Sequence, residues 1–170
     1  MTRVVTLALL ALAVMLVCSS PESGAYPLLV WNATASAPPG LYRIEPAMPL
    51  RLGGLVLLRP DPESAALYAQ RGYLPRGVPL LKPIAAVAGM RVCEQEGRVS
   101  IDGGFAAVAL AVDGMRRPMT PWAGCRTLTG REVLVLNPAV PTSLDGRYFG
   151  PSPISSVLGR AVPLWTWRAR

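Results

Sequence analysis

The pattern of apolar and polar positions divides the chain into two parts. Seventeen uncharged residues, 4–20, are apolar as far as Cys18 apart from one threonine. Beyond them, apolar runs of four to nine residues alternate with segments rich in proline and glycine, which is typical of strands joined by turns. Eighteen prolines and sixteen glycines agree with this, because both residues interrupt long helices. We therefore expect a mainly β domain preceded by one hydrophobic N-terminal helix.

Individual strands are predicted where a short apolar run ends at proline, glycine or charged residues. These runs cover residues 28–31, 41–44, 55–58, 80–87, 91–94, 98–101, 132–136 and 159–167. The runs at 91–94 and 98–101 are expected to form a hairpin. The stretch from there to Arg131 is expected to be a small irregular insertion, and residues 141–153 a turn-rich loop.

One helix is predicted in the domain, over residues 62–70. Asp61 is placed to cap its first turn, Pro62 fits the first helical position, and Gly72 follows its end.

The N-terminal segment has the features of an export signal or a membrane anchor. Arg3 favours a cytoplasmic start, which places the rest of the chain on the far side of the membrane. Ser23 and Ala25 supply small residues for cleavage after Ala25, while Val17 argues against lipid attachment at Cys18. Retention and cleavage both stay open. We expect residues 1–25 to be signal or anchor and 26–170 the domain, either on the bacterial inner membrane facing the periplasm or free in the periplasm.

Charge and cysteine content narrow the classes of partner. The net charge of +7 comes from scattered arginines without a basic run, so we expect a membrane surface and no nucleic acid as partner. In an oxidising compartment, Cys93 and Cys125 predict a disulfide closing about 33 residues and contributing about 3–4 kcal/mol. Two buried free thiols are the alternative. With Cys18 of the N-terminal segment set aside, two cysteines and no histidine are left, so neither a metal nor a cofactor is expected.

The basic residues carry a further signal. Sixteen of the seventeen are arginine, Lys82 is the single lysine, and histidine is absent. A serine nucleophile in such a chain needs lysine as its base. Lowering the lysine pKa from about 10.4 toward about 7 costs roughly 4–5 kcal/mol, which burial among the neighbouring apolar residues can impose. The alternative is a lysine whose stem lies on the sheet while its amine reaches water.

A serine suited to that base lies in the loop after the first predicted strand. Ser36 precedes Pro38-Pro39-Gly40, where a stiff backbone can present a hydroxyl to an extended substrate. Its own N–H and the hydroxyl of Thr34 are candidate oxyanion donors. Without further evidence, both residues are equally consistent with ordinary loop or surface positions.

Three segments in order resemble the conjugal-transfer, TraF-type branch of the signal peptidase I (S26) family, which consists of membrane-anchored Ser-Lys serine proteases. The first resembles the nucleophile box, the second the lysine strand, and the third a Ser-x-Asp-x-Arg-Tyr-Phe-Gly-Pro pattern; they occupy residues 36–43, 81–89 and 143–151. The resemblance covers most of residues 28–165. It implies a signal-peptidase-like antiparallel β-sheet domain.

The resemblance also implies a role for each site residue. Ser36 would be the nucleophile, Lys82 the general base and Ser143 the residue that orients the amine. Asp145 and Arg147 would form a supporting ion pair, against the alternative of a surface turn pair worth under about 1 kcal/mol.

The sequence departs from the housekeeping signal peptidases at three positions: Ala37 replaces a methionine, Pro83 an arginine and Gly89-Met90 a Gly-Asp pair. We therefore expect a specialised serine endopeptidase acting on an exported or membrane protein, a propilin above all, with a linear or cyclic product. A general preprotein signal peptidase and a non-catalytic, membrane-tethered β module are the alternatives.

Overall fold

The computed structural model describes residues 5–6, 27–34 and 36–167. The expected N-terminal helix and the division after residue 25 therefore fall almost entirely outside the described residues. Within the described ranges, no helix is long and apolar enough to cross a membrane.

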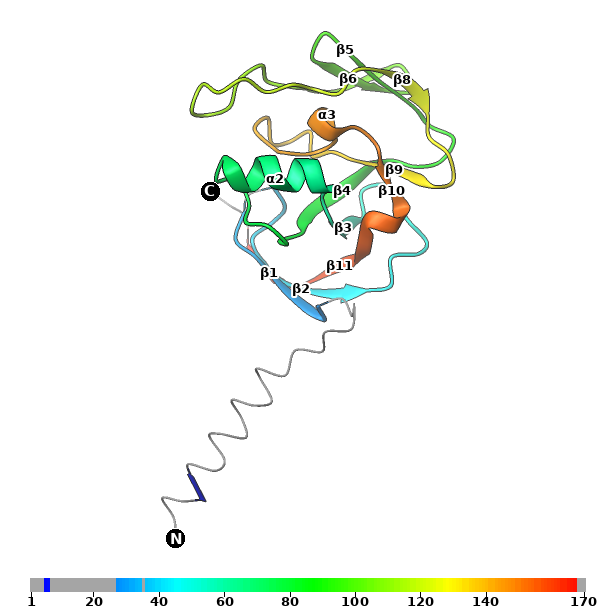
Figure 1. The fold of residues 1–170 in the computed structure, drawn as a ribbon. Coiled ribbons are helices and arrows are strands. Elements are labelled where there is room, and N and C mark those ends of the chain that lie inside the picture. The colour runs from blue at the N-terminus through cyan, green and yellow to red at the C-terminus, as the bar shows by residue number, and fades with distance from the viewer. Residues whose placement is uncertain (1–4, 7–26, 35, 168–170) are drawn as a thin grey trace.

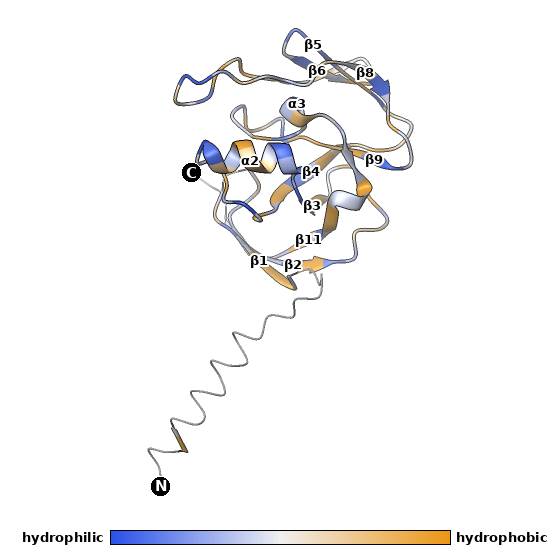
Figure 2. Cartoon of the chain, viewed as in Figure 1, coloured by the Kyte–Doolittle hydropathy of each residue, from blue (hydrophilic) through white to orange (hydrophobic). Residues whose placement is uncertain are grey.

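A seven-stranded antiparallel sheet forms the body of the domain (Figure 1). Its strands, in spatial order, are β1 (Leu29–Asn32), β2 (Gly40–Glu45), β11 (Val157–Thr166), β3 (Leu55–Leu58), β4 (Leu80–Ala86), β9 (Glu132–Val135) and β10 (Ser152–Pro153). The predicted mainly β class is confirmed. All eight predicted strands begin and end within two residues of the expected positions, and the third and sixth match at both ends. Figure 2 shows that apolar residues concentrate in central strands such as β4.

A second, four-stranded sheet corrects the expectation of an irregular insertion. It contains β5 (Arg91–Gln95), β6 (Arg98–Ile101), β7 (Gly104–Val108) and β8 (Gly124–Thr127). Asp102 and Gly103 both have positive φ, 48° and 80°, a turn conformation that joins two twisted antiparallel strands. That Asp-Gly pair was a hairpin signal for β7. The predicted disulfide is confirmed, because Cys93 and Cys125 are register partners on β5 and β8 and are covalently joined.

The segment 141–153 is also more regular than expected. It contains the short helix α3 (Gly146–Phe149) and strand β10, followed by a 3₁₀ turn, η1 (Ile154–Ser156). Asp145 caps α3 by accepting a hydrogen bond from the Arg147 N–H. At Gly146, a Cβ atom would lie 2.5 Å from Leu134 Cδ1 and 2.7 Å from the Val135 carbonyl oxygen. Glycine therefore lets α3 pack directly on β9, where a side chain would clash.

The predicted helix is confirmed as α2 (Pro62–Gln70), with the Asp61 carboxylate accepting a hydrogen bond from the Ser64 N–H at 2.9 Å. Tyr68 of α2 is buried in the main core, which holds Val56, Leu58, Leu80, Ile84, Val133, Val135 and Val157. Strands β3, β4 and β9 all contribute to this core. Strand β4, which carries Lys82, is hydrogen-bonded to β3 on one side and to β9 on the other, so its position is fixed from both sides.

Candidate active site

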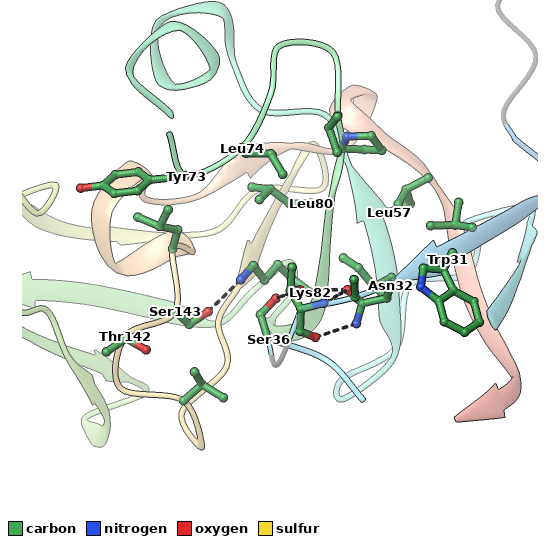
Figure 3. Close-up of a pocket in the computed structure, with 18 of the residues that line it drawn as sticks. Trp31, Asn32, Ser36, Leu57, Tyr73, Leu74, Leu80, Lys82, Thr142 and Ser143 are labelled. Carbon is green, nitrogen blue, oxygen red and sulfur yellow. Dashed lines mark hydrogen bonds between the residues drawn. The ribbon is translucent and has the colours of Figure 1, made fainter. Parts of the chain in front are cut away.

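The loop after β1, the strand β4 and the loop before α3 enclose one cavity of about 510 Å³. Four residues proposed from the sequence line it: Thr34, Ser36, Lys82 and Ser143. Most of the remaining lining is apolar and comes from β1, the segment before β4 and the loop after β9. In Figure 3, the Lys82 amine points to the Ser143 hydroxyl, and Ser36 lies beside it on the same cavity wall.

Lys82 is 2% exposed, so the alternative of an amine that reaches bulk water is wrong. It lies opposite Val56 on β3, and its Nζ donates a hydrogen bond to Ser143 Oγ at 2.8 Å. Burial disfavours the charged amine and lowers the pKa of Lys82 to about 8, against an opposing effect of the Asp145 carboxylate. Near neutral pH the chain thus holds an amine that is partly deprotonated, as a general base must be.

The loop that carries Ser36 is held by a residue that the sequence analysis did not identify. Asn32 is 6% exposed, and its side-chain NH₂ donates to the carbonyl oxygens of Thr34, Ala37 and Pro38 at 3.0–3.2 Å. Its Oδ1 accepts from the N–H and the hydroxyl of Thr34. One buried amide therefore organises the turn, since it satisfies polar groups of Thr34, Ala37 and Pro38.

The hydroxyl protons of Thr34 and Ser36 have defined directions. Thr34 Oγ1 lies 2.8 Å from Asn32 Oδ1, which can only accept, so Thr34 donates its single hydroxyl proton there. Thr34 Oγ1 lies 2.9 Å from Ser36 Oγ, and in that contact Ser36 must be the donor. The expected oxyanion role of Thr34 thus requires its proton to leave Asn32. In this resting arrangement Thr34 holds the Ser36 hydroxyl.

Asp145 and Arg147, which follow Ser143 closely in the chain, form a buried ion pair. They are 0% and 1% exposed, and Arg147 Nε donates to Asp145 Oδ1 at 2.8 Å, so the pair is not a surface turn contact. All five guanidinium N–H groups have acceptors: both carboxylate oxygens and the carbonyls of Val108, Pro141 and Asn137. The pair thereby fixes the loop that places Ser143 against Lys82.

Asn137 is the second residue that the sequence analysis missed. Its side-chain NH₂ donates to the Ser36 carbonyl oxygen at 2.7 Å, across 101 positions of sequence. Asn32 and Asn137 share a signal that was available: each is the first polar residue after an apolar strand run, Leu28–Trp31 and Val133–Leu136. A polar residue placed there is a candidate for satisfying loop backbone groups.

Comparison with known proteins decides the family. A sequence model described as "Signal peptidase, peptidase S26" matches residues 1–167. The chain belongs to the signal peptidase S26 family. In this chain, the three segments that contain Ser36, Lys82 and Ser143 come from separate elements and meet at one cavity.

Relatives with similar sequences are conjugal transfer and plasmid transfer proteins. A probable conjugal transfer protein TraF of Sinorhizobium fredii is 39% identical over 146 residues, covering 80% of this chain and 76% of the relative. The conjugal transfer protein TraF of Agrobacterium tumefaciens is 38% identical over 148 residues, covering 80% and 81%. A plasmid transfer protein TraF of Escherichia coli is 31% identical over 146 residues, covering 80% and 82%. Among solved structures, a signal peptidase I of Enterococcus faecalis overlaps 65% of this chain and 94% of its own at 18% identity, with a TM-score of 0.37.

Proposed function

We propose that this S26 peptidase is a membrane-associated serine endopeptidase with a Ser36/Lys82 dyad. The observation that carries the proposal is the buried amine of Lys82, which lines the same cavity as Ser36, is held by Ser143 and has a pKa lowered to about 8. A lysine desolvated in this way can accept a hydroxyl proton at a pH where an exposed lysine stays charged.

The proposed reaction begins when the Ser36 hydroxyl turns from Thr34 toward Lys82. Ser36 Oγ attacks the scissile carbonyl carbon and its proton passes to Lys82 Nζ, giving a tetrahedral oxyanion. The Ser36 N–H is the proposed donor to that oxyanion, joined by the Thr34 hydroxyl if it rotates away from Asn32. The ammonium of Lys82 then protonates the departing amine as the carbon–nitrogen bond breaks, leaving an acyl-enzyme on Ser36.

The acyl-enzyme is resolved by a second nucleophile. Neutral Lys82 takes a proton from the attacking water, or from an amine of the substrate itself, and returns it to Ser36 Oγ as the ester bond to Ser36 breaks. Water gives a linear product and an internal amine gives a cyclic one, so both products stay within the proposal.

A propilin of a conjugation system is the substrate that we propose. Relatives at 31–39% identity are named conjugal or plasmid transfer proteins. The apolar lining of the cavity suits an extended, uncharged segment of an exported or membrane precursor, because such walls favour apolar side chains.

The membrane is proposed as the second partner. Trp31, Trp165 and Trp167 form an exposed cluster with ring centroids 5.3–6.1 Å apart, and Leu28 and Leu164, close to them in sequence, are exposed too. Indole rings favour the boundary between lipid and water. The cluster lies on β1 and at the end of β11, and Trp31 also lines the cavity, so a precursor leaving the periplasmic face of the inner membrane would meet the site there.

The proposal is tested by co-expressing the full chain with the propilin of a conjugation system. Mass spectrometry should find the shortened pilin with the wild-type chain and the intact precursor with Ser36→Ala or Lys82→Ala, both recovered folded. Processing by Lys82→Ala at the wild-type level would overturn the dyad.

Two further measurements separate the alternatives. Cleavage of generic signal-peptide substrates at a rate equal to that of the propilin would favour a general preprotein signal peptidase. Absence of any acyl adduct on Ser36 with a serine-reactive acylating reagent would favour a non-catalytic module.

A further inference from the structure

The proposed nucleophile, Ser36, and the proposed base, Lys82, lie in different parts of the chain, and their side chains are hydrogen-bonded to other residues. The hydrogen bond of Ser36 Oγ runs to Thr34, and that of Lys82 Nζ runs to Ser143. Attack requires the two groups to meet within hydrogen-bond reach, so another part of the described structure must fix the loop of Ser36 relative to β4.

The side chain of Asn137 makes that connection on the nucleophile side. Its Nδ2 donates to the Ser36 carbonyl oxygen at 2.7 Å, and its Oδ1 accepts from the Ala139 N–H at 3.1 Å. The two contacts require the same orientation of the amide, since one partner only accepts and the other only donates. Ser36 is therefore held through its main chain, which leaves its hydroxyl free to turn.

The backbone of Asn137 makes the connection on the lysine side. Its N–H donates to Asp145 Oδ2 at 2.9 Å, and its carbonyl accepts from the Arg147 guanidinium at 2.8 Å. The preceding residue, Leu136, donates its N–H to the carbonyl of Pro83, directly after Lys82, at 3.1 Å. Asn137 is thus anchored to a fully buried ion pair and to the strand of the base.

We propose that Asn137 is a positioning residue that sets the distance between the Ser36 hydroxyl and the Lys82 amine. The inference rests on the proposed Ser36/Lys82 peptidase and gives the Asp145–Arg147 pair an indirect role in it. The ion pair holds the main chain of Asn137, the Asn137 amide holds the main chain of Ser36, and neither pair member contacts the reacting atoms.

Two variants isolate the amide. Asn137→Ala removes both side-chain contacts and adds no charge. Asn137→Asp keeps the size and the acceptor for Ala139, replaces the donor with an oxygen facing the Ser36 carbonyl, and adds the charge of a carboxylate. Both keep the backbone contacts to Asp145 and Arg147. Ala139→Ser, at an exposed position of the same loop, is the matched control.

The readout is the rate at which 4-nitrophenyl acetate acetylates Ser36 in the full-length chain, followed by intact mass and peptide mapping across pH. We expect both Asn137 variants to react about 10- to 100-fold more slowly, because a misplacement of about 1 Å costs rates of this order. In Asn137→Ala the midpoint of the pH profile should stay at the wild-type value, since the surroundings of Lys82 Nζ are unchanged. Ala139→Ser should react as the wild type does.

Three results would overturn the inference. Acetylation of both variants at the wild-type rate would show that the contact does not position Ser36, while the proposed peptidase would stand. A shifted pH midpoint in Asn137→Ala would mean that Asn137 acts on the lysine instead. Loss of the folded state in both variants, seen as loss of the cooperative thermal transition, would assign a purely structural role. If wild-type Ser36 does not react at all, the proposed function fails and the inference falls with it.

Discussion

At the residue scale, the site depends on how Lys82 is surrounded. Composition made this lysine conspicuous, and the apolar run around it predicted burial. The sequence could not decide between a buried amine and one reaching water, because that depends on what covers the strand end. In the structure Ser143 and the loop before α3 provide the cover, from 61 residues further along the chain.

Lys82→Met should make the folded chain more stable at neutral pH. The pKa of Lys82 is lowered from 10.5 to about 8 on folding, so between those values the unfolded chain binds more protons and the stability of the wild type rises with pH. Below about pH 8 both states are protonated and the full cost, about 3 kcal/mol, is present. Urea denaturation should therefore show the largest gain for the variant below pH 8 and a shrinking gain toward pH 10. A variant less stable than wild type at pH 7 would contradict this.

Asp145→Asn should shift the pH dependence of Ser36 acylation to lower pH. The carboxylate of Asp145 favours the charged amine, so removing it lowers the pKa of Lys82 further. The pH–rate profile of acetylation measures the midpoint directly. The same change leaves Arg147 without its buried counter-charge, for which a loss of about 3–5 kcal/mol is expected from denaturation curves. A midpoint that moves upward would contradict the assigned electrostatics.

At the element scale, periodicity and breakers predicted the main strands and α2 within two residues, because each apolar run is short and bounded by proline, glycine or charge. Besides β8 and β10, the strand β7 and the helix α3 were not predicted from the sequence. Both depend on local features that carry little hydrophobic signal: the Asp102-Gly103 turn and the direct contact of Gly146 with β9. The positions of Asn32 and Asn137 directly after apolar runs made them candidates, but their partners could not be predicted, since these are loop carbonyls whose directions only the fold sets.

Gly40→Ala should disrupt the pairing of β2 with β11 at the end of the loop that carries Ser36. Gly40 begins β2 with φ of 145°, and a Cβ there would lie 2.1 Å from the Trp165 carbonyl oxygen on β11. Backbone on both sides cannot yield, so the β2–β11 pairing must separate at this point. We expect a loss of several °C in thermal midpoint, corresponding to at least about 1–3 kcal/mol.

The matched control for that change is Gly130→Ala. Gly130 has nothing within 4 Å of the added Cβ and no positive φ, so its thermal midpoint should stay near that of the wild type. Equal midpoints for the Gly40 and Gly130 variants would show that the close approach to β11 is not a constraint.

At the scale of the whole molecule, one sheet carries the candidate site residues and the other contains the disulfide. The seven-stranded sheet carries Lys82 and the base of the Ser36 loop, whereas the four-stranded sheet is tied within itself by the Cys93–Cys125 disulfide. The two meet at the ion pair, where Arg147 donates to the carbonyl of Val108 on β7. The site is therefore sensitive to the second sheet through Arg147.

The Cys93→Ser/Cys125→Ser double variant should lose up to about 3–4 kcal/mol, the entropy that a 32-residue cross-link removes from the unfolded chain. Because neither cysteine lines the cavity, the acylation rate at a temperature where the variant is folded should stay within about threefold of the wild type. Denaturation and acetylation rates measured on one preparation give both quantities. A complete loss of acylation in the folded variant would show that the second sheet shapes the site directly.

The central claim, a Ser36 nucleophile served by a neutral Lys82, is tested most directly by the pH dependence of Ser36 acetylation in the wild type and in Lys82→Met. With a pKa of about 8, roughly one tenth of the amine is neutral at pH 7. The wild-type rate should rise about tenfold per pH unit below pH 7, reach half its maximum near pH 8 and level off above pH 9. The folded Lys82→Met chain should lack this acetylation on Ser36. A Lys82→Met chain that acetylates Ser36 with the wild-type rate and profile would contradict the account.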